Sequence, residues 1–123
     1  MSPRKGFFGR LAETDEERLA AEVREWTSAV SNTVRIADAP LREQVRVCGQ
    51  VRRITVWPKE GTDTEYLEAL LSDGTGEVNA EWLGRRSIPG LRLGTRMVLE
   101  GVMREERGRT VPTISNPKFE FVG

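Results

Sequence analysis

Apolar residues recur along this chain with two different periods, and the first is that of a helix. From residue 14 to residue 30 the apolar side chains are spaced by three or four positions: Leu19, Val23, Trp26 and Val30. This spacing places them on one face of an α-helix. Thr14 and Glu17 have the order of a capping box, in which Thr14 caps the first turn and Glu17 reaches back to it. We therefore predict a flexible lead-in over residues 1–10 and a helix from Thr14 to about residue 30, with Trp26 packed on the rest of the protein or on a partner helix.

From Gln44 onward, apolar and polar residues alternate, and Gly or Pro interrupts the pattern at short intervals. Alternation is typical of strands that bury one face, and the interruptions mark turns. A connector over residues 33–43 comes first, with extended backbone at Ala39-Pro40. The pattern then predicts five strands, the last of them interrupted by Asn116-Pro117: residues 44–57, 66–72, 77–83, 95–103 and 110–122.

Local signals add detail to these strands. The apolar phase of the first strand switches near Arg52-Arg53, which predicts a β-bulge, and Gly49 predicts a close approach of another backbone segment. The run Asp73–Gly76 predicts a tight hairpin turn. Cys48 is expected to be a buried thiol with no reactive role. The side chains expected to face inward are Leu67, Ala69, Leu71, Val78, Ala80, Trp82, Met97 and Leu99.

The composition is that of a globular domain, with 37% hydrophobic and 31% charged residues. No stretch approaches the ~20 apolar residues of a membrane span. The basic N-terminus lacks the apolar core of a signal peptide, and the one cysteine cannot form an internal disulfide. We expect a cytoplasmic protein with no membrane contact.

The chain contains no histidine, the commonest general base and metal ligand. It also lacks a phosphate-binding loop of the Gly-x-x-x-x-Gly-Lys type and a paired nucleophile and base. We therefore expect no catalytic residues, no metal site and no cofactor, hence a binding module and not an enzyme. The net charge is zero, with 19 basic and 19 acidic residues. Any surface for a polyanion must come from local clustering of charge.

Several short motifs add a family resemblance over residues 44–122. They are Leu71-Ser72-Asp73-Gly74-Thr75-Gly76, Trp82-Leu83-Gly84, Leu93-Gly94, Leu99-Glu100-Gly101-Val102 and Asn116-Pro117-Lys118-Phe119-Glu120. With five short strands in about 80 residues, the chain resembles the anticodon-binding type of OB family. It is most similar to the wedge domain of branch-migrating DNA helicases, and it also resembles small uncharacterised OB proteins of high-GC bacteria.

The resemblance implies an all-β fold with an added N-terminal helix. Residues 1–40 would form the lead-in, amphipathic helix and connector, and residues 41–123 a five-stranded OB-fold Greek-key barrel. It also implies nucleic-acid binding, to single-stranded or junction DNA or to RNA. Helicase activity is not implied, because the motor that accompanies the wedge domain is absent.

An OB barrel binds oligonucleotides across its second and third strands, between the loop joining strands one and two and the loop joining strands four and five. Single strands need aromatic faces for bases and cations for phosphates. Trp57 and Tyr66 are the aromatic candidates, although Trp57 could cap the barrel end and Tyr66 could be a cross-strand partner. The remaining candidates, each of which could also be a solvated surface residue, are Arg52, Arg53, Lys59, Asn79, Arg85, Arg86, Arg107, Arg109 and Lys118. Arg104 frames the same turn as Arg107 and Arg109.

Acidic residues count against this interface. Glu68 and Glu81 are expected to face outward in the middle of the groove, and Glu105 and Glu106 share a turn with Arg107. The alternative is a protein-interaction module, with a partner protein or self-association. It would act through the N-terminal helix or through the outward side chains of Leu70, Leu83 and Tyr66.

Overall fold

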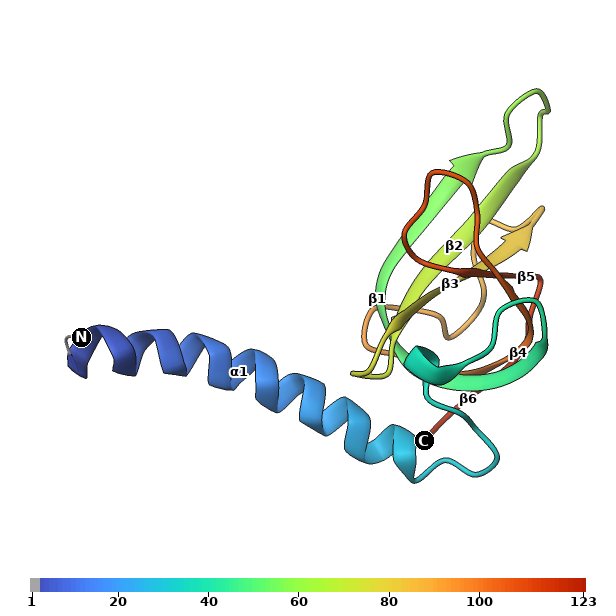
Figure 1. The fold of residues 1–123 in the computed structure, drawn as a ribbon. Helices are drawn as coiled ribbons and strands as arrows, with labels where there is room; N and C mark the ends of the chain where they lie inside the picture. Colours follow the sequence, from blue (N-terminus) through green and yellow to red (C-terminus); the bar gives the residue numbers. More distant parts are fainter. Residues whose placement is uncertain (1–2) are drawn as a thin grey trace.

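The six strands of residues 44–121 form one sheet that curls back on itself (Figure 1). The computed structural model describes the backbone of residues 3–123 and the side chains of residues 15–123. The strand order is β1-β2-β3-β5-β4-β6, and an additional β1–β4 pairing closes the first five into an uneven ring. The elements are α1 (Pro3–Ser28), the 3₁₀ turn η1 (Ile36–Asp38), β1 (Gln44–Pro58), β2 (Glu65–Ser72), β3 (Glu77–Leu83), β4 (Arg96–Arg104), β5 (Thr113–Ser115) and β6 (Lys118–Phe121).

The first four strands lie within one residue of their predicted bounds, but the predicted fifth strand is two strands. β5 pairs with β3 in parallel and with the end of β4, whereas β6 pairs only with residues 97–100 of β4. The division falls at Asn116-Pro117. Asn116 takes a left-handed φ of 48°, and Pro117 has no N–H to donate to a ladder. The chain therefore turns there and leaves the ring.

The bulge in β1 is confirmed. Val51 pairs with Leu71 and Arg53 with Leu70, so Arg52 is an extra residue in the ladder. The bulge bends β1, whose first half pairs with β4 and whose second half pairs with β2. A Cβ on Gly49 would lie 3.1 Å from both Leu71 Cβ and Ser72 O. The predicted close approach at this glycine is also confirmed.

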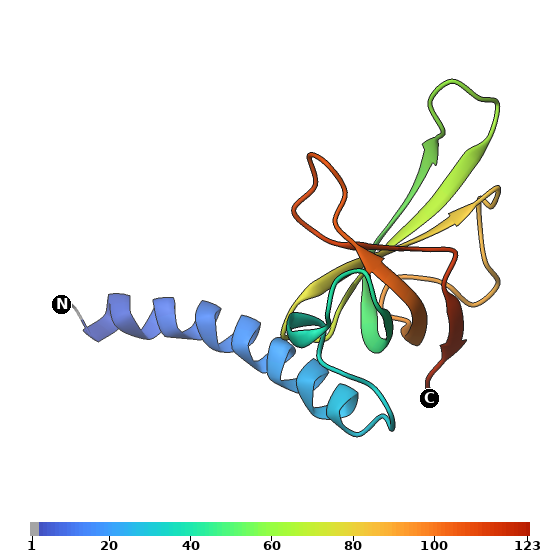
Figure 2. The same cartoon turned by 45° about the vertical axis from the view of Figure 1, so that its right-hand side comes forward.

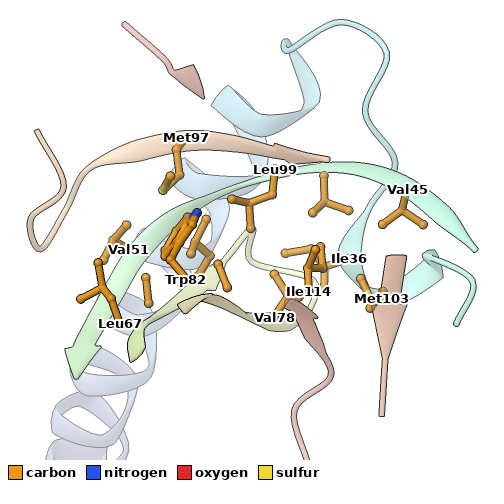
Figure 3. Close-up of a cluster of buried hydrophobic side chains, with 14 of the residues drawn as sticks. Ile36, Val45, Val51, Leu67, Val78, Trp82, Met97, Leu99, Met103 and Ile114 are labelled. Carbon is orange, nitrogen blue, oxygen red and sulfur yellow. The ribbon is translucent and has the colours of Figure 1, made fainter. Parts of the chain in front are cut away.

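All eight side chains predicted to face inward are buried in the core of the ring. Figure 3 shows Trp82, Met97 and Leu99 pointing into the space between the strands. The Trp82 ring meets Phe119 edge-on, with centroids 5.4 Å apart. Cys48 is buried as predicted; its Sγ lies 3.5 Å from the Thr27 carbonyl. Burial raises the pKa of this thiol, which keeps it protonated and unreactive.

The helix is longer than predicted. It begins at Pro3, so the predicted lead-in is wrong for residues 3–10, and Thr14 is an interior helical position and not the N-cap. Proline is favoured in the first turn of a helix because its fixed φ suits it and no N–H is lost. Figures 1 and 2 both show the N-terminal part of α1 leading away from the strands.

Only part of the predicted apolar stripe of α1 is buried. Val23 is buried against the rest of the protein, and the Trp26 ring lies under the Arg96 guanidinium, 4.9 Å from its centroid. Leu19, one turn earlier, is 57% exposed. The C-terminal part of the helix therefore packs on the sheet.

No helix in residues 3–123 combines the length and hydropathy of a membrane span.

The predicted hairpin turn at Asp73–Gly76 is confirmed, and it also anchors the connector. The Asp73 carboxylate accepts hydrogen bonds from the backbone N–H groups of Thr75 at 2.9 Å and Gly76 at 3.1 Å. Its other oxygen accepts one from Ile36 N–H at 2.8 Å. Ile36 is thereby held in the core ahead of β1.

Candidate nucleic-acid interface

The outer face of β1, β2 and β3 carries three cross-strand rows of side chains. Strand residues alternate between faces, so this face is opposite the buried side chains of Leu67 and Ala69. The registers define an aromatic row at one end and an acidic row in the middle. At the other end lies a row whose β2 and β3 residues are buried and whose β1 residue is exposed. These rows are Trp57–Tyr66–Leu83, Thr55–Glu68–Glu81 and Arg53–Leu70–Asn79.

The loop joining β4 and β5, residues 105–112, closes part of this face (Figure 1). The Pro112 carbonyl accepts a hydrogen bond from Asn79 N–H at 2.9 Å. Asn79 is only 1% exposed, and Leu70 beside it is also buried. The expectation that both residues face solvent is therefore wrong. Their phase in the strand is outward as predicted, but a later segment of the chain covers them.

The acidic row is held by an arginine of the same loop. Arg109 donates two hydrogen bonds to the Glu68 carboxylate, at 2.7 and 2.9 Å. The Glu68 side chain is 2% exposed, which corrects its predicted place as a free charge in the groove. Arg109 also lies 3.8 Å from Glu81 Oε1 and 3.8 Å from Glu106 Oε2. Because Arg109 serves three carboxylates, it is not a free phosphate ligand.

Glu81 is the poorly compensated acid of this cluster. Its side chain is 16% exposed. Burial, followed by the charges of Glu106 and Glu68, raises the pKa of Glu81 to about 7, and Arg109 opposes the shift. Glu81 and Glu106 line a cleft of about 330 Å³ together with Lys59, Tyr66, Leu83, Ser115 and Asn116.

The raised pKa of Glu81 predicts a loss of stability as pH rises. Its ordinary value is 4.5 and its folded value about 7, so the folded protein binds this proton more tightly than the unfolded chain. The resulting stability is present at low pH and is lost as pH rises through 7. We expect the free energy of unfolding to fall by about 1 kcal/mol between pH 6 and pH 8.

Urea titrations at the two pH values measure this difference. Glu81→Gln cannot ionise and is expected to remove most of the dependence, whereas the exposed Glu77→Gln is expected to retain it. An equal pH dependence in wild type and Glu81→Gln would assign the effect to another group.

The aromatic row remains open. Trp57 is 44% exposed, Leu83 is exposed and Tyr66 lies half-buried between them. Trp57 is therefore not sealed against the barrel end, and its ring is accessible. Lys59 follows on the β1–β2 loop, which its backbone N–H closes by a 2.7 Å hydrogen bond to Thr64 O. Burial raises the pKa of the Tyr66 phenol, so it stays a neutral platform.

The other predicted cations are distributed over several places. Arg85 and Arg86 are exposed directly after β3, with Arg86 Nε 3.0 Å from Glu65 Oε2. Arg107 is exposed in the β4–β5 loop beside Glu106. Lys118 is exposed on β6, opposite Glu100 of β4. The structure therefore does not bring Lys118 to the face that carries Trp57.

Some basic residues were missed because candidates were taken only from the places that commonly border an OB binding site. Residues 44–59 and 82–99 contain eight basic residues and no acidic one. The fold joins these segments: Val51 N–H donates to Thr95 O at 2.8 Å, and Gly94 N–H donates to Val51 O at 2.9 Å. Arg92 and Arg96 in the second segment were not predicted, although a scan for acid-free windows would have found them.

We define the bulge patch as Arg52, Arg53 and Arg92. All three are exposed, and none forms a salt bridge with a side chain of residues 15–123. Arg92 is fixed beside the bulge, because its N–H donates to Thr95 Oγ1 at 3.1 Å and Thr95 O accepts from Val51 N–H.

Within the described side chains, no group of three or more Cys, Asp or Glu residues is arranged to hold a metal ion.

Three solved structures show what this arrangement resembles. A protein of Methanobacterium thermoautotrophicum related to replication factor A has 16% identity and a TM-score of 0.58, over 75% of this chain and 92% of its own. The chain has an OB fold. RecG bound to a three-way DNA junction matches with 19% identity and a TM-score of 0.56 over 68% of this chain, which spans only 12% of the RecG chain. An OBody bound to hen egg-white lysozyme matches with 18% identity and a TM-score of 0.52, over 76% of this chain and 96% of the OBody chain.

These likenesses confirm the predicted OB fold, and at such identities they concern the fold alone. No protein-family model and no curated protein matches the sequence. Any proposal about the ligand of this chain therefore rests on the residues of its own OB face.

Proposed function

We propose that this OB domain binds nucleic acid, as single-stranded or junction DNA, with RNA as a further candidate, and that it works in the cytoplasm. The observation that carries the proposal is the open aromatic row between basic residues. Trp57 exposes its ring on the outer face, Lys59 follows it on the loop, and Arg85 and Arg86 follow the strand that carries Leu83. Aromatic faces for bases beside cations for phosphates are what single-stranded nucleic acid requires.

The comparison with RecG supports testing a branched ligand, since that OB-containing structure holds a three-way DNA junction. Asn79 and Arg109 do not belong to the proposed interface, because one is buried and the other is bound to Glu68. The proposed interface consists of Arg52, Arg53, Trp57, Lys59, Tyr66, Arg85 and Arg86.

A protein-interaction module is the second candidate. The OBody shows that this fold can present a surface to another protein. In this chain Leu19 on α1 and Leu83 on β3 are exposed apolar side chains that could contact a partner. This candidate predicts no salt-sensitive affinity for nucleic acid.

Fluorescence anisotropy with fluorescein-labelled probes tests the proposal. The probes are single-stranded DNA of about thirty nucleotides, RNA of the same length and a three-way junction, each at low and moderate salt. We expect affinity that weakens as salt rises, because bound cations release counterions from the phosphates. No binding to any probe at low salt would contradict the proposal and favour the protein-interaction module.

Trp57→Ala is expected to weaken binding by about 5- to 160-fold, since stacking on one base contributes ~1–3 kcal/mol. Phe121→Ala is the matched control, because Phe121 is an aromatic residue with 42% exposure on β6, away from the outer face of β1–β3. An equal loss in both variants would exclude Trp57 as a specific stacking platform.

A further inference from the structure

The acidic row argues against a strand of nucleic acid crossing the middle of β2 and β3. Glu68, Glu81 and Glu106 gather there around Arg109, which is already bound to Glu68. Lys59 lines the cleft with Glu81 and Glu106 but forms no salt bridge with them. The next outward residues of β2 and β3, Leu70 and Asn79, are buried. A phosphate placed there would meet like charges, and like-charge contacts oppose binding at an interface.

The bulge patch offers the opposite environment. The bulge adds Arg52 to the ladder, so two successive arginines reach solvent at one point of β1. Arg92 joins them from the β3–β4 loop through Thr95. The two segments that supply these arginines contain no acid, whereas the whole chain is neutral. Arginine also offers phosphate a planar fork of donors.

The bulge patch and the aromatic row lie on the same strand. Arg53, Thr55 and Trp57 alternate onto the outer face of β1, so Arg53 and Trp57 are about 13 Å apart along the strand. β1 pairs with β4 only as far as Gln50. One edge of its second half pairs with β2, and the other edge lies on the side away from Glu68 and Glu81.

We propose that a nucleic-acid strand follows β1, with phosphates on Arg52, Arg53 and Arg92 and a base on Trp57, and does not cross the acidic row in the middle of the β2–β3 face that OB folds commonly use. This inference rests on the proposed function and specifies the path of the ligand. It identifies Arg92 as a phosphate contact, although Arg92 lies in the β3–β4 loop and not in either of the two loops that flank the common OB site.

Two triple variants that remove the same charge test the path. Arg52→Gln/Arg53→Gln/Arg92→Gln removes the bulge patch. Arg104→Gln/Arg107→Gln/Lys118→Gln removes three exposed cations on β4, the β4–β5 loop and β6. Anisotropy is measured with single-stranded DNA from 50 to 300 mM salt, and thermal melts establish that both variants are folded.

We expect the bulge-patch variant to lose at least tenfold in affinity at low salt. Its log–log salt slope should fall by about 2, because each phosphate contact on a single strand contributes ~0.7 to the slope. The matched variant should lose less than threefold. Equal losses, or a larger loss in the matched variant, would overturn the path while the proposed function stands. A wild-type protein that binds no probe would overturn both.

Discussion

Arg109→Met is expected to lower the free energy of unfolding by about 3 kcal/mol, because it leaves the Glu68 carboxylate buried without its partner. Glu68 is 2% exposed and receives two hydrogen bonds from Arg109. Breaking a buried pair costs roughly 3–5 kcal/mol. The Arg109 side chain is 29% exposed, so water partly screens the pair and the lower end of that range applies.

Urea denaturation of four proteins measures this effect. Arg107→Met, two residues away and exposed, should change stability by less than about 0.5 kcal/mol. The double variant Glu68→Leu/Arg109→Met should regain most of the loss, since an apolar pair can replace a buried ion pair at little cost. A loss below 1 kcal/mol in Arg109→Met would mean that Glu68 is hydrated in solution and that the loop does not seal it.

The same variant should release the β4–β5 loop. Asn79 N–H is bonded to Pro112 O where the loop enters its pairing with β3, so its amide protection reports on whether that end of the loop stays paired. We expect hydrogen exchange at Asn79 to accelerate in Arg109→Met by more than the change in global stability explains. That result would show that an interaction between residues 41 positions apart holds the loop in place.

Asp73→Ala is expected to cost about 3 kcal/mol, because one buried carboxylate serves both the β2–β3 turn and the connector. The side chain accepts hydrogen bonds from three backbone N–H groups and from the Thr75 hydroxyl at 2.6 Å. Without it, the buried Ile36 N–H has no acceptor, and an orphaned buried donor costs roughly 1–3 kcal/mol.

The conservative variant Asp73→Asn separates the two roles. Its single carbonyl oxygen can still serve the turn, but its amide group cannot accept from Ile36 N–H, so we expect an intermediate loss. Asp63→Ala removes an exposed aspartate from another loop and should leave the urea midpoint unchanged. If Asp73→Ala and Asp63→Ala lose the same stability, the connector is not anchored through this carboxylate.

Local pattern was sufficient for most of the barrel. Alternation identified the strands and their inward side chains, including Trp82, because each strand buries one face and the period of a strand is two. The bulge at Arg52 and the close approach at Gly49 were also predictable, since phase switches and strand glycines have local causes. The hairpin at Asp73 follows from turn chemistry within four residues.

The candidate site depended on contacts that no local pattern contains. Asn79 and Tyr66 both lie in the outward phase, yet Asn79 is buried and Tyr66 lines the cleft. The difference depends on a segment more than thirty residues later, which pairs with β3 at Asn79. In the sequence, nothing distinguishes Arg109 from a solvated surface arginine. Only the fold brings it to Glu68.

The sequence by itself determined the OB barrel, its core and the aromatic residues of its outer face. Only the tertiary structure decided which of the outward residues are free to meet a ligand. The reason is that burial of the inward side chains is a property of each strand, whereas access to the outer face depends on where a distant loop lies and which charges it pairs.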